Sequence, residues 1–581
     1  MRLIRKERPP RERKMAPTAE SDSLAAVVKD YWDVMLEADP LYATVLGNRR
    51  FDDRLGDITP EGRRRLDEQT EAISRRCRAI SEKPLSEADK LTRTILLVDA
   101  QRHLEHSSCG LDDWTVDPLD GPQVQFQNIE STQPVRTPAE GRAMVKRWLA
   151  IGRFVDDHIS NLNRGAREGK LPVKILVEKC IEEIEDLLAK QDTDLSFLRP
   201  LAQERAGWKE ADVREFRSDL TAATKGTVKP AFARYGEFLR RNILPRSRPQ
   251  DRPGIMHVEG GLSAYTRLIR FHTSLDLTAD QLHQTGLEEV GRINGEMESL
   301  GEKVFGFRDR VRVLERLRTD RSLYFNSREE VEAKAQSALS RAKAAIPKWF
   351  GTLPRTDCVV VRMEEHEEKH STIAYYRQPA ADGSRPGSYY INTSAPETRP
   401  RYEAEALANH ESIPGHHLQI ARAQELADIP DFRRYTGVTA FVEGWGLYAE
   451  RLSDEMGLYS SDLDRIGVLS YDSWRACRLV VDTGMHAKGW SREQAIDYMM
   501  KNSALAKNNI VNEVDRYITW PGQALAYKTG QLEIMRLRRE AEKKLGKRFD
   551  IRGFHDAVLG NGAVPLEVLR QAVHVWAESR L

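Results

Sequence analysis

The chain has 581 residues, enough for one large helical core or for roughly two to four domains of ordinary size. Its 90 Lys and Arg residues are balanced by 89 Asp and Glu residues, and the net charge of +1 argues against nucleic acid or an anionic membrane as partner. The five scattered cysteines form no C-x-x-C pair, and no run of about 18 apolar residues occurs. We therefore expect a cytoplasmic protein that acts on a small or moderate-sized molecule.

The first 22 residues are basic and lack an apolar segment, so they predict a disordered tail over residues 1–22, followed by one α-rich catalytic unit over residues 23–581. In that unit, apolar residues recur at three- and four-residue spacing, which is typical of amphipathic helices. Such helices are expected over residues 23–36, 61–80, 86–106, 213–244, 277–300 and 328–346. Thr278 is a candidate N-cap.

A change of pattern between about residues 357 and 394 predicts a small β-sheet. The runs CVVVRME, STIAYYRQP and SYYINTS are rich in β-branched and aromatic residues and are bounded by Gly and Pro. We expect Tyr390 and Asn392 to lie at an edge of this sheet, where an extended substrate can pair with the backbone. The alternative is that these strand residues serve only in packing.

Two histidine clusters follow, and each resembles part of the zinc-binding pattern H-E-x-x-H. The literal match, HEEKH at residues 366–370, is surrounded by charged residues and joins two strand-like runs, so we interpret His366 and His370 as part of a polar connection. The second, HESIPGHHLQ at residues 410–419, has helix formers on both sides but carries Pro414 where the second histidine should stand. The second cluster has the better context for a metal site.

The spacing of the second cluster does not fit an unbroken helix. There, His416 and His417 would lie about 9 and 10.5 Å along the axis from His410, too far to share an ion. Pro414 and Gly415 allow extra residues to bulge out, and a two-residue bulge returns His416 to the place of an i+4 ligand. His417 would need a third extra residue, or would turn toward the substrate. The alternative is a proline-kinked helix with buried, hydrogen-bonded histidines.

A third ligand is expected in TAFVEGWGLYAERL, residues 439–452. Glu443 lies there among apolar residues, and a buried carboxylate must be paired or coordinated. Gly444 and Gly446 weaken the predicted helix, which is intelligible if another backbone approaches closely. Glu450, two turns further on, is a weaker ligand candidate and a candidate partner for a ligand.

These motifs resemble the bacterial "domain of unknown function 885" family, as do RLVVDTGMHAKGW, EVDRYITWPGQALAYKTG and PGSYYINTS further along the chain. The resemblance implies the zincin superfamily with a glutamate as third ligand. It also implies a mainly α, metallopeptidase-like fold with a deep cleft, with the metal-site helices at about residues 402–452 and the small sheet before them. Relatives there carry H-E-x-G-H, which aligns Gly415 and His416 with their Gly-His. One zinc ion per chain would then bind His410, His416 and Glu443.

The predicted reaction is hydrolysis of an amide, most of all a peptide bond, with Glu411 as the general base. Tyr527 is the first candidate for stabilising the oxyanion and His486 the second, because related peptidases use a tyrosine or histidine from the C-terminal half. Arg516 and Tyr517 are candidates for holding a substrate carboxylate. For each of these four residues, a role as a packed, hydrogen-bonded core residue is the alternative.

Three classes of function are therefore open. The first is a zinc peptidase that cleaves a peptide or small amide, with His417 as a possible substrate contact. The second is a zinc amidohydrolase acting on a non-peptide metabolite or biosynthetic conjugate. The third is an inactive binding protein on the same scaffold, and the presence of Glu411 beside the ligands argues against it, since binding needs no general base.

Overall fold

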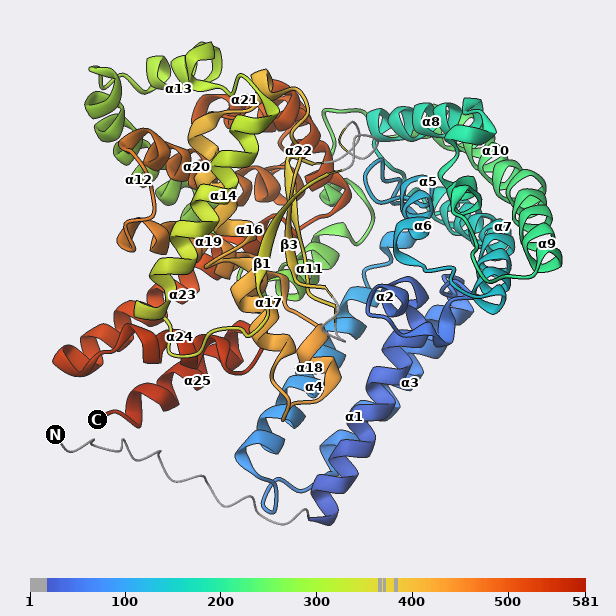
Figure 1. The fold of residues 1–581 in the computed structure, drawn as a ribbon, viewed down its shortest axis with the longest axis horizontal. Coiled ribbons are helices and arrows are strands. Elements are labelled where there is room, and N and C mark those ends of the chain that lie inside the picture. The colour runs from blue at the N-terminus through green and yellow to red at the C-terminus, as the bar shows by residue number, and fades with distance from the viewer. Residues whose placement is uncertain (1–17, 364–367, 369–371, 381–384) are drawn as a thin grey trace.

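The computed structural model describes residues 18–363, 368, 372–380 and 385–581 and is mainly helical, with one small sheet (Figure 1). This confirms the expected mainly α class. None of the helices in these ranges combines the length and the apolar composition that a bilayer crossing requires.

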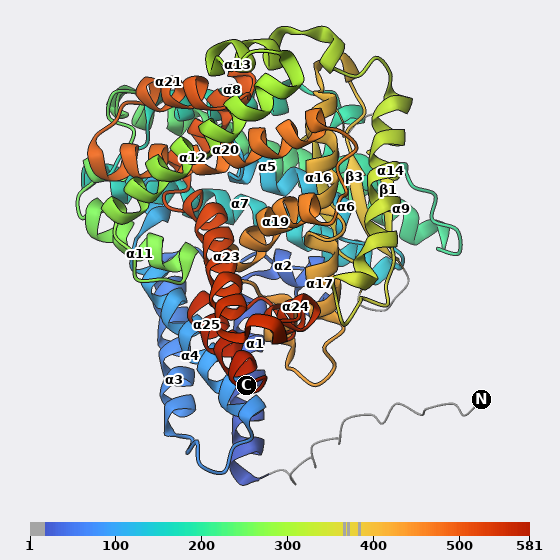
Figure 2. The same ribbon diagram turned by 90° about the vertical axis from the view of Figure 1, so that its left-hand side faces the viewer.

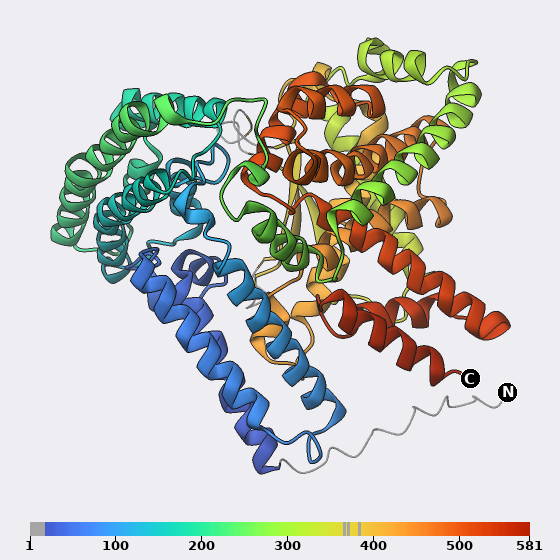
Figure 3. The same cartoon turned by 180° about the vertical axis from the view of Figure 1, so that it is seen from behind.

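The N-terminal helices form a long arm (Figure 3). It consists of α1 (Ala19–Ala38), α3 (Pro60–Ala79) and α4 (Glu87–Ser107), which pack against one another, with the short α2 (Pro40–Val45) between α1 and α3. The side chains of Thr18, Thr59 and Ser86 cap the three long helices by accepting a backbone N–H of the first turn. The predicted tail boundary at residue 22 is therefore wrong, because Thr18 starts the helix at Ala19.

A second group of helices has a hydrophobic core of its own, at the right of Figure 1. Its long members are α7 (Pro138–Arg167), α8 (Lys174–Ala189), α9 (Glu210–Ala223) and α10 (Lys229–Phe238), and the short α5 (Pro122–Gln125) and α6 (Ile129–Thr132) precede them. Trp148, Phe197 and Phe232 lie at the centre of this core and are fully buried. The helix expected over residues 213–244 is thus α9 and α10, joined by a π-helical turn.

The remaining helices build the body that carries His410, His416 and Glu443 (Figures 1 and 2). Before the sheet these are α11 (Gly261–Thr273), α12 (Ala279–Phe305), α13 (Arg310–Thr319) and α14 (Arg328–Ala345). After it come α16 (Ala404–Glu411), α17 (His416–Gln424), α18 (Asp431–Tyr435), α19 (Thr439–Glu455), α20 (Asp462–Lys488), α21 (Arg492–Asn502), α22 (Lys507–Thr519), α23 (Leu525–Leu545), α24 (Ile551–Leu559) and α25 (Leu566–Glu578).

Helix α20 is the central element of this body. Almost all of its side chains from Ile466 to His486 are buried, and α12 packs along its length while α19 packs along α23. Thr278 caps α12 in a capping box with Gln281, which confirms the predicted N-cap. Helix α20 is therefore the buried helix on which α16 and α19 pack.

The predicted small sheet is confirmed. Its strands β1 (Cys358–Arg362), β2 (Ala374–Arg377) and β3 (Gly387–Ile391) lie in the order β1-β3-β2, with β1 parallel and β2 antiparallel to β3. Because β3 is the middle strand, the edge position expected for Tyr390 and Asn392 is wrong. His366 and His370 of the HEEKH motif lie outside the described residues.

Candidate metal centre

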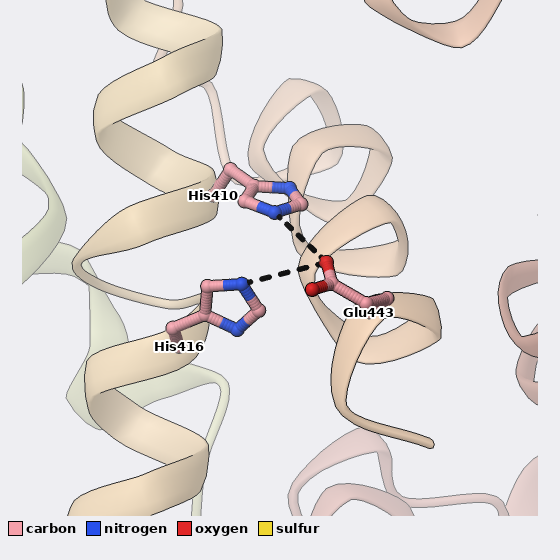
Figure 4. Close-up of side chains that lie close together, drawn as sticks. All are labelled: His410, His416 and Glu443. Atoms are coloured by element: carbon pink, nitrogen blue, oxygen red, sulfur yellow. Dashed lines mark ion pairs between the residues drawn. The ribbon is translucent and has the colours of Figure 1, made fainter. Parts of the chain in front are cut away.

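Three side chains from three helices converge in the body (Figure 4). Nε2 of His410, at the end of α16, lies 3.5 Å from Oε2 of Glu443, and Nε2 of His416, the first residue of α17, lies 3.6 Å from the same oxygen. The three atoms that could bind an ion lie within 4.8 Å of one another, and no other such group of three His, Cys, Asp or Glu residues occurs in the described part of the chain. The three atoms are close enough together to contact one ion.

The residues present fit a zinc ion. Zinc lies about 2.0–2.1 Å from its nitrogen and oxygen ligands, so two ligands at a tetrahedral angle are about 3.3 Å apart. Both histidines are buried and direct Nε2 toward Glu443, and Nδ1 of His416 has no hydrogen-bond partner among the described residues. Two imidazoles and one carboxylate also form the ligand set of several catalytic zinc sites, which leave one position open.

The turn between α16 and α17 sets the spacing of the two histidines. Helix α16 ends at Glu411 and α17 begins at His416, so the chain makes two helices with a four-residue break where we expected a bulge within one helix. The indole Nε1 of Trp445 donates a 2.9 Å hydrogen bond to the carbonyl oxygen of Pro414. A Cβ on Gly415 would lie 1.9 Å from the carbonyl oxygen of His410, so the turn requires glycine there.

The two glycines of α19 mark close approaches, and the predicted approach of another backbone is found at Gly444 but not at Gly446, which meets a side chain. A Cβ on Gly446 would lie 2.5 Å from Cε1 of the His410 ring. A Cβ on Gly444 would lie 2.5 Å from the backbone of Gly530 on α23. Helix α19 can therefore pack directly against a ligand ring on one side and against a neighbouring helix on the other.

A second carboxylate lies behind His410. Oε1 of Glu450 is 2.8 Å from Nδ1 of His410, and the Glu450 side chain is fully buried. The guanidinium of Arg475, also buried, lies 3.9 Å from the same oxygen. A carboxylate in this position fixes the orientation and tautomer of a histidine ligand.

The pKa values of Glu411 and Glu443 are shifted in opposite directions. Burial raises the pKa of Glu411, and the charges of His416 and His410 oppose this shift only in part. Burial would also raise the pKa of Glu443, but hydrogen bonds from His410 and His416 hold it well below its usual range. Glu443 is thus an ionised acceptor, while Glu411 is a carboxylate of increased basicity.

Tyr527 lies between the cluster and a pair of arginines. Burial raises the pKa of its phenol, the charge of Glu443 adds to the shift, and Arg478 and Arg516 oppose it. The guanidinium of Arg478 stacks 4.1 Å from the centre of the Tyr527 ring. Arg516 donates to Gln523 at 2.7 Å and to Glu513 at 2.9 Å.

Two of the predicted site residues in the C-terminal half are instead structural. Nδ1 of His486 accepts the backbone N–H of Ile255 at 3.1 Å and Nε2 donates to the carbonyl of Tyr517 at 2.9 Å, so neither nitrogen is left for an oxyanion. The fully buried hydroxyl of Tyr517 donates to Glu513 and accepts from Arg478 and Trp474. The oxyanion role expected for His486 and the substrate-carboxylate contact expected for Tyr517 are therefore wrong, and both residues fit the alternative of packed, hydrogen-bonded core residues.

The substrate contacts expected near the sheet are not found either. His417 is fully buried, with Nε2 donating to the carbonyl of Thr356 at 3.1 Å and Nδ1 lying 3.0 Å from the hydroxyl of Tyr376, so its ring points away from the ligands. The Asn392 amide donates to the carbonyl oxygens of Glu368 and Thr372. Tyr390 stacks on Tyr375 with ring centres 4.9 Å apart. All three side chains hold the sheet together.

Sequence reasoning missed the face of α20 that passes the metal centre. Tyr471, Trp474, Arg475 and Arg478 share this face because they are three or four residues apart. Arg475 stacks on Trp474 at 4.0 Å and Arg478 at 4.3 Å. The signal that could have revealed it is the pair Arg475 and Arg478, three residues apart, next to the aromatic residues Tyr471 and Trp474 at helical spacing.

Comparison with known families identifies the chain. Residues 40–573 match the family described as "Bacterial protein of unknown function (DUF885)". The chain belongs to this family. No curated protein matches the chain.

Two solved structures resemble this member of the DUF885 family. One, described as a "putative lipoprotein" from Colwellia psychrerythraea, has 26% sequence identity and a TM-score of 0.89, with 97% of this chain and 100% of that chain covered. The other, described as a "putative lipoprotein of unknown function" from Shewanella oneidensis, has 18% identity and a TM-score of 0.73, with 96% and 99% covered. The second comparison bears on the fold alone.

Proposed function

We propose that this DUF885 protein is a zinc-dependent hydrolase that cleaves an amide bond, with a peptide bond as the favoured substrate. The observation that carries the proposal is the convergence of His410, His416 and Glu443 within 4.8 Å, with Glu411 next to the first ligand in the chain. The proposal includes the zincin superfamily, the metallopeptidase-like cleft and one zinc ion per chain.

His410, His416 and Glu443 would hold the ion, and Glu450 would keep the His410 ring oriented through its 2.8 Å contact with Nδ1. When bound, a zinc ion supplies Lewis acidity, which polarises a carbonyl group and acidifies water. Glu411 then accepts a proton from the attacking water and delivers it to the leaving amine. Its buried position, which raises its pKa, suits a base that works near neutral pH.

The remaining roles belong to the C-terminal half. Tyr527 would donate its phenolic hydrogen to the carbonyl oxygen on which negative charge develops, and Arg478, stacked on its ring, would keep it in place. Arg516 would attract a substrate carboxylate, because it and Arg478 share the single carboxylate of Glu513 and leave a net positive charge.

The test is a paired measurement on the full-length protein. Elemental analysis should find about one zinc per chain, and a set of blocked dipeptides and N-acyl amino acids should reveal hydrolysis by the wild type but not by Glu411→Gln. Zinc without hydrolysis of any amide would overturn the reaction. A preparation that takes up no zinc when it is supplied would overturn the whole proposal.

The cytoplasmic location expected from the sequence stays a prediction. The name lipoprotein is given to the two solved structures, and cell fractionation of the full-length protein tests whether the same location applies here.

A further inference from the structure

A cavity of about 350 Å³ is lined in part by α16, the helix that carries His410 and Glu411. Its walls come from α14, the sheet, α16, α20 and the start of α22. The apolar part of the lining is formed by Phe325, Val331, Ala335, Ile391 and Leu407. This volume is within the range of about 300–1,000 Å³ that is typical of small-molecule sites.

The cavity and the predicted general base share a wall. Leu407 lines the cavity, and Glu411 lies one helical turn further along the same face of α16. Tyr389, on β3, also lines the cavity. Burial raises the pKa of the Tyr389 phenol, and the nearby charge of Glu411 adds to this increase. The cavity therefore lies one helical turn from Glu411 along α16.

One lining residue has an unused hydrogen-bonding group. The carboxylate of Glu403 is buried, and its Oε1 accepts a 2.7 Å hydrogen bond from the hydroxyl of Ser470. Within the described ranges, Ser470 is the one hydrogen-bond donor to the Glu403 carboxylate, on which the charge of Arg475 also acts. Burial raises the pKa of Glu403 to about 7. An unpaired buried carboxylate is costly, so an acceptor kept here indicates a ligand that supplies the donor.

The arginines that line the cavity are engaged elsewhere. Arg318 donates to the backbone carbonyl groups of Met500, Ser503 and Leu505. Arg399 donates to the carbonyl oxygen of Ser394 at 3.1 Å. Neither guanidinium satisfies Glu403.

We propose that the cavity receives a substrate side chain with an apolar body and a hydrogen-bond donor at its end, and that Glu403 accepts the hydrogen bond from this donor. That the bound molecule is a substrate rests on the proposed amide hydrolysis. That the cavity binds such a molecule does not depend on it. The apolar part of the substrate side chain would pack on Ile391 and Leu407, and its terminal donor would give the Glu403 carboxylate a second hydrogen bond. A site built in this way discriminates strongly against an analogue that lacks the donor, because its buried acceptor stays unpaired.

The experiment measures binding without turnover. Full-length Glu411→Gln protein is titrated by calorimetry at pH 8 with four ligands: N-acetyl-tyrosinamide, N-acetyl-phenylalaninamide, N-acetyl-lysinamide and N-acetyl-norleucinamide. We expect the tyrosine ligand to bind at least about tenfold more tightly than the phenylalanine ligand, or the lysine ligand than the norleucine ligand. The first result assigns a neutral donor and the second a cationic one. Equal affinities in both pairs would overturn the proposal.

Three further variants in the same background assign the effect to the cavity. Glu403→Met should abolish the preference within each pair, whereas Glu183→Gln, which alters a distant carboxylate whose pKa burial also raises to about 7, should leave it intact. Ala335→Leu narrows the cavity from the α14 side and should weaken every ligand that enters it. Circular dichroism and thermal melting verify that each variant is folded. A preference that survives Glu403→Met would contradict the role of this carboxylate.

Failure of this inference and failure of the proposed function can be told apart. Hydrolysis of glycine amides by the wild type tests the metal-centre chemistry without filling the cavity. Hydrolysis with no preference in the binding assay would overturn the cavity assignment alone. A clear preference with no hydrolysis of any amide would overturn the hydrolase alone.

Discussion

Oε1 of Glu450 lies 2.8 Å from Nδ1 of His410, while Nε2 of the same ring faces Glu443. With zinc bound, the Glu450 carboxylate would keep hydrogen on Nδ1, so that the lone pair of Nε2 would be free for the ion. The prediction is that Glu450→Gln lowers zinc affinity by about 10–100-fold. Competition with a chelator of known affinity measures this. Glu455→Gln, on the exposed end of the same helix, is the control, and equal zinc affinity for the two variants would contradict the role of Glu450.

Removing a ligand should remove the metal. His410→Ala, His416→Ala and Glu443→Ala each delete one of the three converging atoms, so we expect each purified variant to contain far less than one zinc per chain. His574→Ala, at an exposed position, is the matched control and should keep the ion. Elemental analysis of the four variants in parallel decides the outcome. Full zinc content after loss of His416 would exclude it as a ligand.

Glu411→Gln should separate metal binding from turnover. The substitution keeps the size of the side chain and removes its ability to accept a proton, so kcat should fall by at least about 100-fold. Zinc content and melting temperature should stay close to those of the wild type, because Glu411 is not among the converging ligands. A variant that keeps its activity would show that another group acts as the base.

The two tyrosines near Arg478 should behave differently. Tyr527→Phe removes a hydroxyl donor near Glu443, so kcat should fall by about 10²–10³-fold with little change in stability. Tyr517→Phe leaves the buried donors of Arg478 and Trp474 without their acceptor, so the free energy of unfolding should fall by about 1–3 kcal/mol. Steady-state kinetics and denaturant unfolding of both variants test this contrast. A large loss of stability in Tyr527→Phe would contradict it.

Much of the fold follows from local sequence signals. The apolar spacing and the capping residues of α1, α3, α4 and α12 lie within the helices themselves, so pattern alone located them. The same holds for the β-branched runs of the small sheet. Strand order could not be predicted, because pairing partners are set by tertiary contacts, and this is why Tyr390 was assigned to an edge.

The site was predictable only in part, for a related reason. The break at Pro414 and Gly415 indicated that the histidine spacing could change, but the contact that fixes the turn comes from Trp445, 31 residues further on. His486 and Tyr517 have the residue types of catalytic groups, and only their distant backbone and side-chain partners reveal a structural role. Glu403 carried no sequence signal, since it is one acidic residue among many.

A buried acid outside the metal centre should make stability depend on pH. Burial raises the pKa of Asp482 from 3.8 to about 7, although Tyr265 and the backbone of Gly522 donate hydrogen bonds to it. Between these two values the unfolded chain has lost a proton that the folded chain keeps, so the stability that this group contributes is complete below about pH 4 and is lost as the pH rises through about 7.

The measurement compares wild type with Asp482→Asn, which cannot titrate. The free energy of unfolding of the wild type should fall relative to that of the variant between pH 4 and 8, by up to about 4 kcal/mol at roughly 1.4 kcal/mol per pKa unit. Asp497→Asn, at an exposed position of α21, is the control. A difference that does not change with pH, or that grows in the opposite direction, would contradict the prediction.

The contact between Trp445 and the Pro414 carbonyl has a mechanical consequence. Helix α19 supplies the carboxylate of Glu443 and, two residues later, the indole that holds the turn before His416. Helix α19 thus sets both the position of Glu443 and, through the turn at Pro414, the distance between His410 and His416. A displacement of α19 would therefore move the Glu443 carboxylate and pull on the turn before His416 at the same time.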